Sequence, residues 1–342
     1  MLSRTADHLF WMARYTERAE NAARMLDVRI QYSLMPQSAQ AEQQGWRTML
    51  EVSELEHQFG AKYSELSQKN VIDFMVRDPD HPSSIVNCLR AARENARAVR
   101  GSLPTEAWET VNTTWLMLQQ HLDKRLYETN PSQFLEWVKY RSHMSRGVII
   151  GTMFQDEAFN FIRLGTFLER ADNTARILDV KFKFLEANPE QDEEQGEFYY
   201  LAALLRSVSA FETYRKVYRD AITPTRVAEL LILHAKMPRS LIASVAAVVE
   251  NLEEVRNDVS RDTERQAQKL RAMLQSVDID EILERGLHEF LTSFLASIAE
   301  IGNGISRDFL MPPAPDPEDS APAQSQTQTQ TQTQTQTQTQ TR

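Results

Sequence analysis

The chain has 342 residues, of which 42% are hydrophobic and 25% charged, values ordinary for a globular protein with a sizeable core. Its formal net charge of −10 disfavours non-specific binding to nucleic acid phosphates, so we expect no nucleic acid partner. The single cysteine, Cys88, excludes an intrachain disulfide framework and fits a reducing compartment.

The N-terminal segment MLSRTADHLFWMARY has charges every few residues and no apolar core, so it does not resemble a signal peptide. The longest weakly charged stretch, SLIASVAAVVENL from Ser240, is too short to span a bilayer. We therefore expect a cytoplasmic protein with no membrane partner.

Apolar residues recur at helical spacing along most of the chain, and glycine is scarce, at 10 residues. This pattern predicts an all-α fold, with prolines and a glycine marking most of the breaks between helices. The predicted helices are Ser3–Leu34, Trp46–Phe59, Asn70–Arg77, Ser83–Arg100, Thr105–Thr129, Asp156–Leu185, Glu197–Arg219, Arg226–His234, Arg239–Leu274 and Asp278–Arg307.

Nearly the same twelve residues occur twice, as ERAENAARMLDV from Glu17 and as ERADNTARILDV from Glu169. The alignment extends in order to later segments, where Pro82 and Ser84 match Pro238 and Ser240. It predicts an internal duplication with halves at about 1–150 and 153–310. We expect a single helical domain over 1–310, a bundle with pseudo-twofold symmetry in which the helices from Ser3 and Asp156 are neighbours.

After about residue 311 the composition changes to a proline-rich linker, MPPAPDPEDSAPAQSQ, followed by a threonine and glutamine repeat. Neither segment has the apolar residues that would bury a core. We therefore predict that residues 311–342 are disordered.

The repeated helix has an apolar packing face and, on roughly the opposite side, a group of polar residues bracketed by apolar ones. The polar residues are Arg14, Glu17, Asn21 and Arg24 in the first copy, and Glu169, Asn173 and Arg176 in the second. Apolar residues above and below them predict that this side is partly buried, where a charge must be paired. One hypothesis is a buried network between the copies, with pairs such as Glu17–Arg176 and Glu169–Arg24. The other is a central cavity that binds a polar ligand.

A second polar feature occurs in one half only. The helix SIVNCLRAARENARAVRG has a complete apolar face, and its other side carries an arginine stripe at Arg90, Arg93, Arg97 and Arg100. The aligned residues of the second half are Ala246, Val249, Glu253 and Arg256, so the shared fold does not require the stripe. Clustered guanidinium groups bind carboxylates or phosphates, although a solvated face paired with nearby acidic residues would look the same.

Several well-known site patterns are absent from the sequence. It has no glycine-rich phosphate loop, no nucleophile elbow and no zinc-type Cys/His spacing. One Glu-x-x-His occurs, at Glu54–His57, whereas a di-iron bundle needs two such pairs and two further glutamates. We therefore predict no metal site and no cofactor in this chain.

The N-terminal stretch MLSRTADHLFWMARYTERAENAARMLDV is similar to the opening of the bacterial alpha-E domain proteins, a family of unknown function. The segments ARENAR at Ala92, FNFIRLGTFLERADNTARILDV at Phe159 and MPRSL at Met237 resemble later parts of that family. The chain departs from the expected pattern at Thr166, where an arginine would follow Gly165, and in TMFQDE at Thr152, which lacks a basic residue before the aspartate.

This resemblance implies a helical protein encoded beside, or fused to, a circularly permuted ATP-grasp amide ligase. ATP and Mg²⁺ would then be bound by the partner ligase. The role implied is that of an accessory subunit without catalytic activity of its own, in a system that makes or modifies peptides. Two alternatives stay open: an independent enzyme acting on a small polar or peptide substrate at the Glu/Asn/Arg positions, and a purely structural scaffold.

Overall fold

A computed structural model of the protein describes residues 1–35, 38–187 and 194–311, and these form one compact unit ending at Met311. Within those ranges the regular structure is helical and no strand occurs, which confirms the prediction of an all-α fold. The predicted disordered tail lies, from residue 312 onward, outside the described residues. No helix in the described part is both long enough and apolar enough to cross a membrane.

Two groups of helices follow one another along the chain. The first group is α1 (Ser3–Ser33), α2 (Ala39–Val52), α3 (Glu56–Lys62), α4 (Gln68–Arg77), α5 (Ile85–Ala98), the 3-10 turn η1 (Arg100–Ser102), α6 (Thr105–Asp123), α7 (Leu126–Thr129) and α8 (Pro131–Thr152). The second group is α9 (Glu157–Ala187), α10 (Glu194–Ser207), α11 (Phe211–Tyr218), α12 (Pro224–Ile232), α13 (Leu241–Glu254), α14 (Arg261–Ser276), α15 (Ile279–Arg285), α16 (Leu287–Ile305) and the π-helical turn η2 (Ser306–Leu310).

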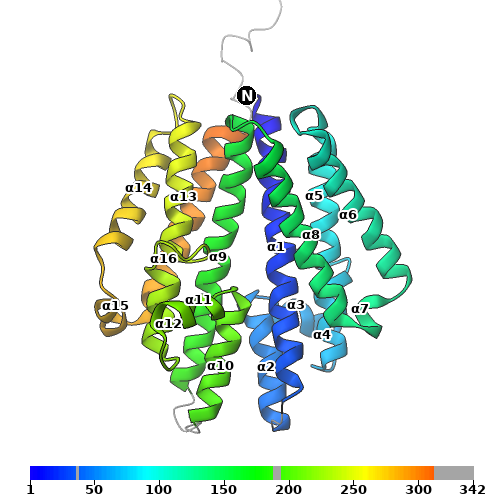
Figure 1. The fold of residues 1–342 in the computed structure, drawn as a ribbon, viewed down its shortest axis with the longest axis vertical. Helices are drawn as coiled ribbons and strands as arrows, with labels where there is room; N and C mark the ends of the chain where they lie inside the picture. The colour runs from blue at the N-terminus through cyan, green and yellow to red at the C-terminus, as the bar shows by residue number, and fades with distance from the viewer. Residues whose placement is uncertain (36–37, 188–193, 312–342) are drawn as a thin grey trace, which may run out of the picture. The chain divides into compact units, whose positions relative to one another are not determined.

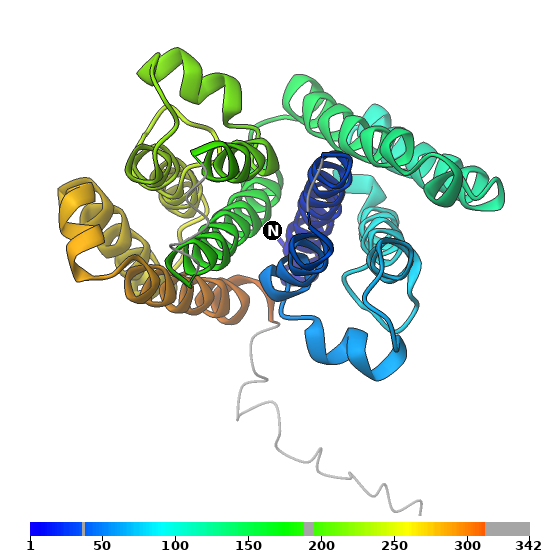
Figure 2. The same ribbon diagram turned by 90° about the horizontal axis from the view of Figure 1, so that it is seen from below.

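The long helices α1 and α9 run side by side through the middle of this unit (Figure 1). Seen along their length, α5, α6 and α8 lie on the α1 side, and α13, α14 and α16 lie on the α9 side (Figure 2). The prediction that the helices beginning near Ser3 and Asp156 are neighbours is therefore correct. The internal duplication stays a prediction.

Helices α1 and α9 approach each other closely at Gly165. A Cβ atom added there would lie 2.3 Å from the carbonyl oxygen of Phe10, so only glycine fits without a shift of backbone. Ala19 and Ala23, small residues of the predicted packing face of α1, are fully buried. Because other helices pack on α1 as well, its burial extends beyond that face to Phe10 and to polar residues such as Glu20.

Several predicted helices are divided in the structure. The predicted helix Trp46–Phe59 is broken after Val52, because Glu54 adopts a left-handed conformation (φ 57°) and the Leu55 amide donates to the Leu50 carbonyl at 2.9 Å. This is the Schellman arrangement that ends a helix. The predicted helices Thr105–Thr129, Glu197–Arg219, Arg239–Leu274 and Asp278–Arg307 are likewise each two helices.

Helix α8 is not among the helices predicted from the sequence. Pro131 is one of the prolines that the sequence pattern predicts to be breaks between helices, but it stands at the start of α8, where its missing N–H costs nothing. The preceding Asn130 caps the helix by accepting a hydrogen bond from the Gln133 amide at 3.2 Å. Helix α8 packs on α1 and supplies one of the charged residues described below.

Candidate functional site

Two Glu-Arg dipeptides, Glu17-Arg18 on α1 and Glu169-Arg170 on α9, form reciprocal ion pairs where the two helices meet. Glu17 accepts from Arg170 through two contacts, Nε to Oε1 at 3.0 Å and Nη2 to Oε2 at 3.2 Å. Glu169 accepts from Arg18 in the same way, at 2.6 and 2.9 Å. Each glutamate therefore binds the arginine of the other dipeptide, so these pairs hold α1 and α9 together.

Further arginines surround both carboxylates. Glu17 also accepts from Arg239, in the turn before α13, at 2.9 Å and from Arg146 of α8 at 2.8 Å. Glu169 accepts from Arg14 at 2.9 Å. Glu17 is 1% exposed, so its charge is compensated by these contacts in place of water.

Glu20, one turn beyond Glu17, is a second buried acceptor on α1. It binds Arg239 and Arg24, both at 2.6 Å, and the Ser142 hydroxyl at 2.9 Å. The Asn21 side-chain oxygen accepts from Arg239 at 3.0 Å. We call the group that forms these contacts the buried ion network; its members are Arg14, Glu17, Arg18, Glu20, Arg24, Arg146, Glu169, Arg170 and Arg239.

The carboxylates of the network remain ionised. Burial alone would raise the pKa of Glu17, but the charges of Arg170, Arg239 and Arg146 outweigh burial and lower it, despite the opposing charge of Glu20. For Glu169, burial likewise raises the pKa, and Arg14 and Arg18 lower it by more. The pKa of Glu20 is also lowered, because Arg239, Arg146 and Arg24 outweigh its burial.

The structure corrects the pairs expected from the sequence. Glu17 does not bind Arg176 and Glu169 does not bind Arg24. Arg24 binds Glu20 on its own helix, and Arg176 binds Asp172 at 2.9 Å and Glu54 of the α2–α3 turn. The reason is distance along the helix. Arg176 is seven residues past Glu169, about 10 Å along α9, whereas Arg170 lies at the level where the helices cross.

A cavity of about 340 Å³ lies beside Arg18 and Glu169, and we call it the inner cavity. The wall includes Asn21 and Asn173 of the two repeated segments and His81 and Ser83 of the α4–α5 turn. Asn87 fixes that turn, because its side-chain nitrogen donates to three turn carbonyls, that of His81 at 2.8 Å among them. Among the described residues, the Asn21 and Asn173 side-chain nitrogens and both His81 ring nitrogens have no hydrogen-bond partner.

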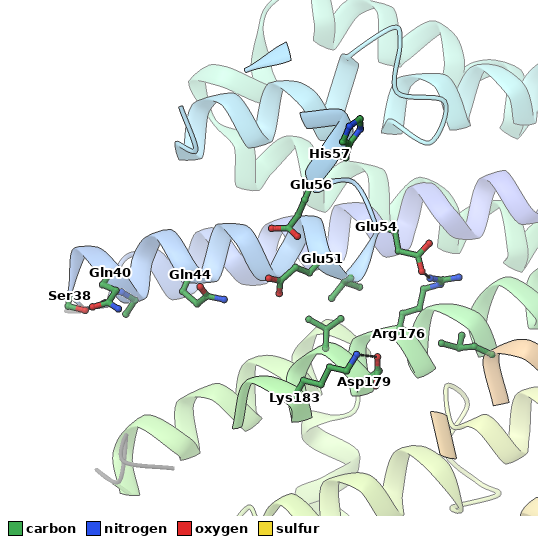
Figure 3. A pocket seen from close by; sticks show the side chains of 14 residues that line it. Ser38, Gln40, Gln44, Glu51, Glu54, Glu56, His57, Arg176, Asp179 and Lys183 are labelled. Atoms are coloured by element: carbon green, nitrogen blue, oxygen red, sulfur yellow. Dashed lines mark hydrogen bonds and ion pairs between the residues drawn. The ribbon is translucent and has the colours of Figure 1, made fainter. Parts of the chain in front are cut away.

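A wider space of about 850 Å³, the outer cleft, lies between α2 and α9. Glu51 and Glu54 on one side face Arg176, Asp179 and Lys183 of α9 on the other (Figure 3). The outer cleft and the inner cavity share Val52, Glu54 and Arg176 as lining residues. Nowhere in residues 1–35, 38–187 and 194–311 do three or more histidine, cysteine or acidic side chains gather in an arrangement suited to a metal ion.

The arginine stripe lies on the solvent side of α5. Arg90, Arg97 and Arg100 are exposed and Arg93 is half-buried, its Nε donating to Asn112 of α6 at 3.0 Å. Arg93 and Arg97 both contact Glu94 at 2.6 Å. Arg100 stands outside α5, in η1, with its guanidinium 5.7 Å from the Trp108 ring. The predicted continuous helix Ser83–Arg100 therefore ends before the last arginine.

We expect the buried ion network to make folding sensitive to acid. The folded-state pKa values of Glu17, Glu20 and Glu169 lie below their ordinary value of 4.5, so they stabilise the protein above pH 4.5 and this stabilisation is lost as pH falls below it. Urea unfolding measured from pH 7 to pH 3 should show Glu169→Gln far less stable than the parent at pH 7. The difference in the free energy of unfolding between the parent and Glu169→Gln should become smaller towards pH 3. A difference that does not change with pH would show that the carboxylate is not ionised in the folded protein.

Comparison with known proteins places this sequence in a family. A family model named Alpha-E, described as "a predicted alpha-helical domain with a conserved ER motif", matches residues 1–310. Curated relatives, uncharacterised proteins of Mycobacterium bovis and of two strains of Mycobacterium tuberculosis, are each 23% identical over 323 residues, 86% of this chain and 35% of theirs. The chain thus spans about a third of the length of these relatives. No solved structure matches it.

Proposed function

Because the chain belongs to the Alpha-E family, we propose that it is a helical partner of an amide- or peptide-forming ligase of the ATP-grasp type. In this role the ligase binds ATP and Mg²⁺, and the present chain contributes a docking surface without catalytic activity of its own. The proposal extends the resemblance in the sequence to a circularly permuted ATP-grasp system.

The length of the relatives supports a role alongside another protein module. The matching region is 35% of each mycobacterial relative, so the rest of each chain consists of other sequence. The Glu-Arg motif in the family description fits Glu17-Arg18 and Glu169-Arg170, which join the two central helices. We therefore assign these residues to the fold, and place the contact with the partner elsewhere.

The arginine stripe is the surface that carries the proposal. The opposite face of α5 is buried through Ile85, Leu89 and Ala92, so the exposed arginines are not needed for packing. Arg90 has no ion-pair partner in the part of the chain that the structure describes. An acidic surface of a ligase would supply the missing charge, with binding that weakens as salt screens it.

We also propose that the two halves arose by duplication and retain pseudo-twofold symmetry. Helices α5 and α13 occupy aligned positions, each has 14 residues, and each is capped by an aligned serine, Ser84 or Ser240. The arginine stripe is then a feature that one half alone carries.

The test is the double charge reversal Arg90→Glu with Arg97→Glu. We expect a folded protein whose affinity for the ATP-grasp ligase encoded beside it falls at least about tenfold, since about 1.4 kcal/mol of lost charge attraction produces that change. Calorimetry at two salt concentrations measures it. Arg93 is left in place because it also contacts Asn112 of α6.

The matched control is Arg261→Glu with Lys269→Glu, the same change of charge on exposed positions of α14. It should bind as the parent protein does. Equal affinities for the two double variants, or binding that salt does not weaken, would contradict docking through the stripe. A parent protein that does not bind the ligase would favour the scaffold alternative.

A further inference from the structure

We propose that two copies of this chain associate through the outer face of α8, with the two α8 helices antiparallel about a twofold axis. The proposal goes beyond the partnership with a ligase and does not depend on docking through the arginine stripe. It rests on an exposed apolar face that carries no charge, and on a pattern of large side chains and glycines in that face that is complementary to itself.

The outer face of α8 is formed by exposed residues that recur at helical spacing. Four of them are spaced four, three and four apart and so lie along one side of the helix: Tyr140, Met144, Gly147 and Gly151. Tyr140 is 64% exposed and Met144 49%, and Ile150, at the edge of the same face, is 57% exposed. The other side of α8 packs on α1 and α6, so this face is not needed for packing within the chain.

The outer face of α8 carries no charge at pH 7. Within residues 140–152 no exposed residue is acidic, lysine or arginine. Arg141 and Arg146 of this stretch are half-buried and bind partners on α6 and α1. Partial burial lowers the pKa of the exposed His143 below its ordinary value of 6.5, so its ring is neutral. Because the chain has a net charge of −10, two copies approach each other most readily through a face without charge.

The helix at the corresponding place in the second group of helices lacks such a face. Helix α16 packs on α9 as α8 packs on α1. None of the large apolar side chains of α16 is exposed, and its exposed residues include Glu289, Thr292, Ser293 and Glu300. An apolar outer face is therefore not a requirement of this fold, and the exposed apolar residues of α8 indicate a contact with another molecule.

The pattern within the outer face of α8 identifies that molecule as a second copy. Two pairs of residues have the same midpoint on α8, between residues 145 and 146: Tyr140 with Gly151, and Met144 with Gly147. One twofold axis at that midpoint therefore places each large side chain over a glycine of the other copy. Nothing lies within 4 Å of a Cβ atom added at either glycine, so each leaves open space for that side chain. A surface that matches itself under one twofold axis is the requirement for an isologous dimer.

The exposed apolar area suits a weak dimer. Phe154, which follows the end of α8, is 83% exposed and extends the face. With Tyr140, Met144 and Ile150 it exposes on the order of 500 Å² of side chain per copy. A pair of such faces buries on the order of 1,000 Å², the lower limit for a specific interface. We therefore expect a dissociation constant on the order of 10 μM, so that dilute solutions contain mostly monomer.

Sedimentation equilibrium of the full chain tests whether it associates. The mean mass should rise from that of a monomer towards that of a dimer, and no further, as the protein concentration goes from about a tenth of the expected dissociation constant to about ten times it. A mass that stays at the monomer value over this range would overturn the proposal.

Two variants of one residue locate the interface. Met144 lies within half a turn of the axis, so Met144→Glu or Met144→Lys would bring like charges of the two copies together. Each variant alone should associate at least about tenfold more weakly than the parent, and an equimolar mixture of the two should recover association. The matched control, Ala299→Glu on the exposed side of α16, should associate as the parent does. Association that neither Met144 variant weakens would reject this interface.

Cysteine cross-linking tests the direction of the helices and does not require a charge within the interface. In the double variant Tyr140→Cys with Gly151→Cys, the two thiols of one chain are 11 residues apart, about 16 Å along α8, too far for a disulfide within the chain. Mild oxidation should therefore yield a covalent dimer, whereas Tyr140→Cys alone should not. Cys88 is fully buried and does not compete. Cross-linking by Tyr140→Cys alone would show parallel helices and contradict the antiparallel arrangement.

The dimer and the docking of a ligase can be told apart. Arg90→Glu with Arg97→Glu should leave self-association unchanged, because the arginine stripe lies on α5 and η1. A parent chain that stays monomeric, together with a loss of ligase binding in Met144→Glu, would assign the outer face of α8 to the ligase and reject the dimer. Failure of the dimer leaves docking through the arginine stripe intact, because that proposal is tested on other residues with a different partner.

Discussion

Replacing Glu17 by alanine should destabilise the protein by about 3–5 kcal/mol, the largest effect that we expect from a single substitution. The change removes one buried carboxylate and leaves Arg170, Arg239 and Arg146 without one of their acceptors. A buried guanidinium group that has lost its carboxylate still pays the desolvation free energy of burial, and no ion pair offsets it. Urea unfolding at pH 7, followed by circular dichroism, measures the loss.

The matched control for Glu17→Ala is Glu281→Ala. Glu281 forms an exposed ion pair with Arg285, one turn away on α15, so its loss should cost below about 1 kcal/mol. Equal, small costs for the two variants would show that the buried ion network does not hold the fold. Such a result would favour the other hypothesis for these polar residues, that they line a central cavity that binds a polar ligand.

Replacing Gly165 by alanine should cost about 1–3 kcal/mol, because a Cβ atom there would lie 2.3 Å from the Phe10 carbonyl oxygen. The obstacle is backbone of α1, so it cannot move aside as a flexible side chain would. Helices α1 and α9 would have to separate, and the contacts between Arg18 and Glu169 would lengthen with them. Thermal and urea unfolding of the variant measure the cost.

Gly147→Ala is the control for this substitution. Gly147 is also inside a long helix, α8, but nothing lies within 4 Å of a Cβ atom there. Alanine should therefore stabilise the protein by up to about 1 kcal/mol through its helix propensity. If Gly165→Ala left the free energy of unfolding as little reduced as Gly147→Ala does, this result would contradict the close approach of α1 and α9.

The sequence predicted the parts of the fold that depend on local pattern. The helical spacing of apolar residues located α1 and α9 to within a few residues, and the repeated segment made them neighbours. Helix ends that depend on backbone conformation were not predicted. Glu54, which follows α2, has a left-handed conformation that glutamate rarely adopts, so the sequence does not mark the end of that helix. Helix α8 was missed because a proline at a helix start and a proline in a break look alike in sequence.

The polar network was predicted only in part, for a geometric reason. The helical wheel placed the buried polar residues of α1 on one side of the helix only. Other helices pack around α1, so Arg18 and Glu20, which lie outside that side, also belong to the network. The repeated dipeptide was the signal that could have revealed Arg18 and Arg170. Arg146 and Arg239 come from α8 and a distant turn, and no local pattern marks them.

The exchange of partners between the two Glu-Arg dipeptides is most directly tested by a double-mutant cycle on Arg18 and Glu169. Their contact has two hydrogen bonds, at 2.6 and 2.9 Å, and joins α1 to α9. Free energies of unfolding are measured for the parent, Arg18→Met, Glu169→Gln and the double variant. We predict a coupling of about 1–3 kcal/mol, because each single change strands the other group. Additive single effects, with no coupling, would contradict the exchange.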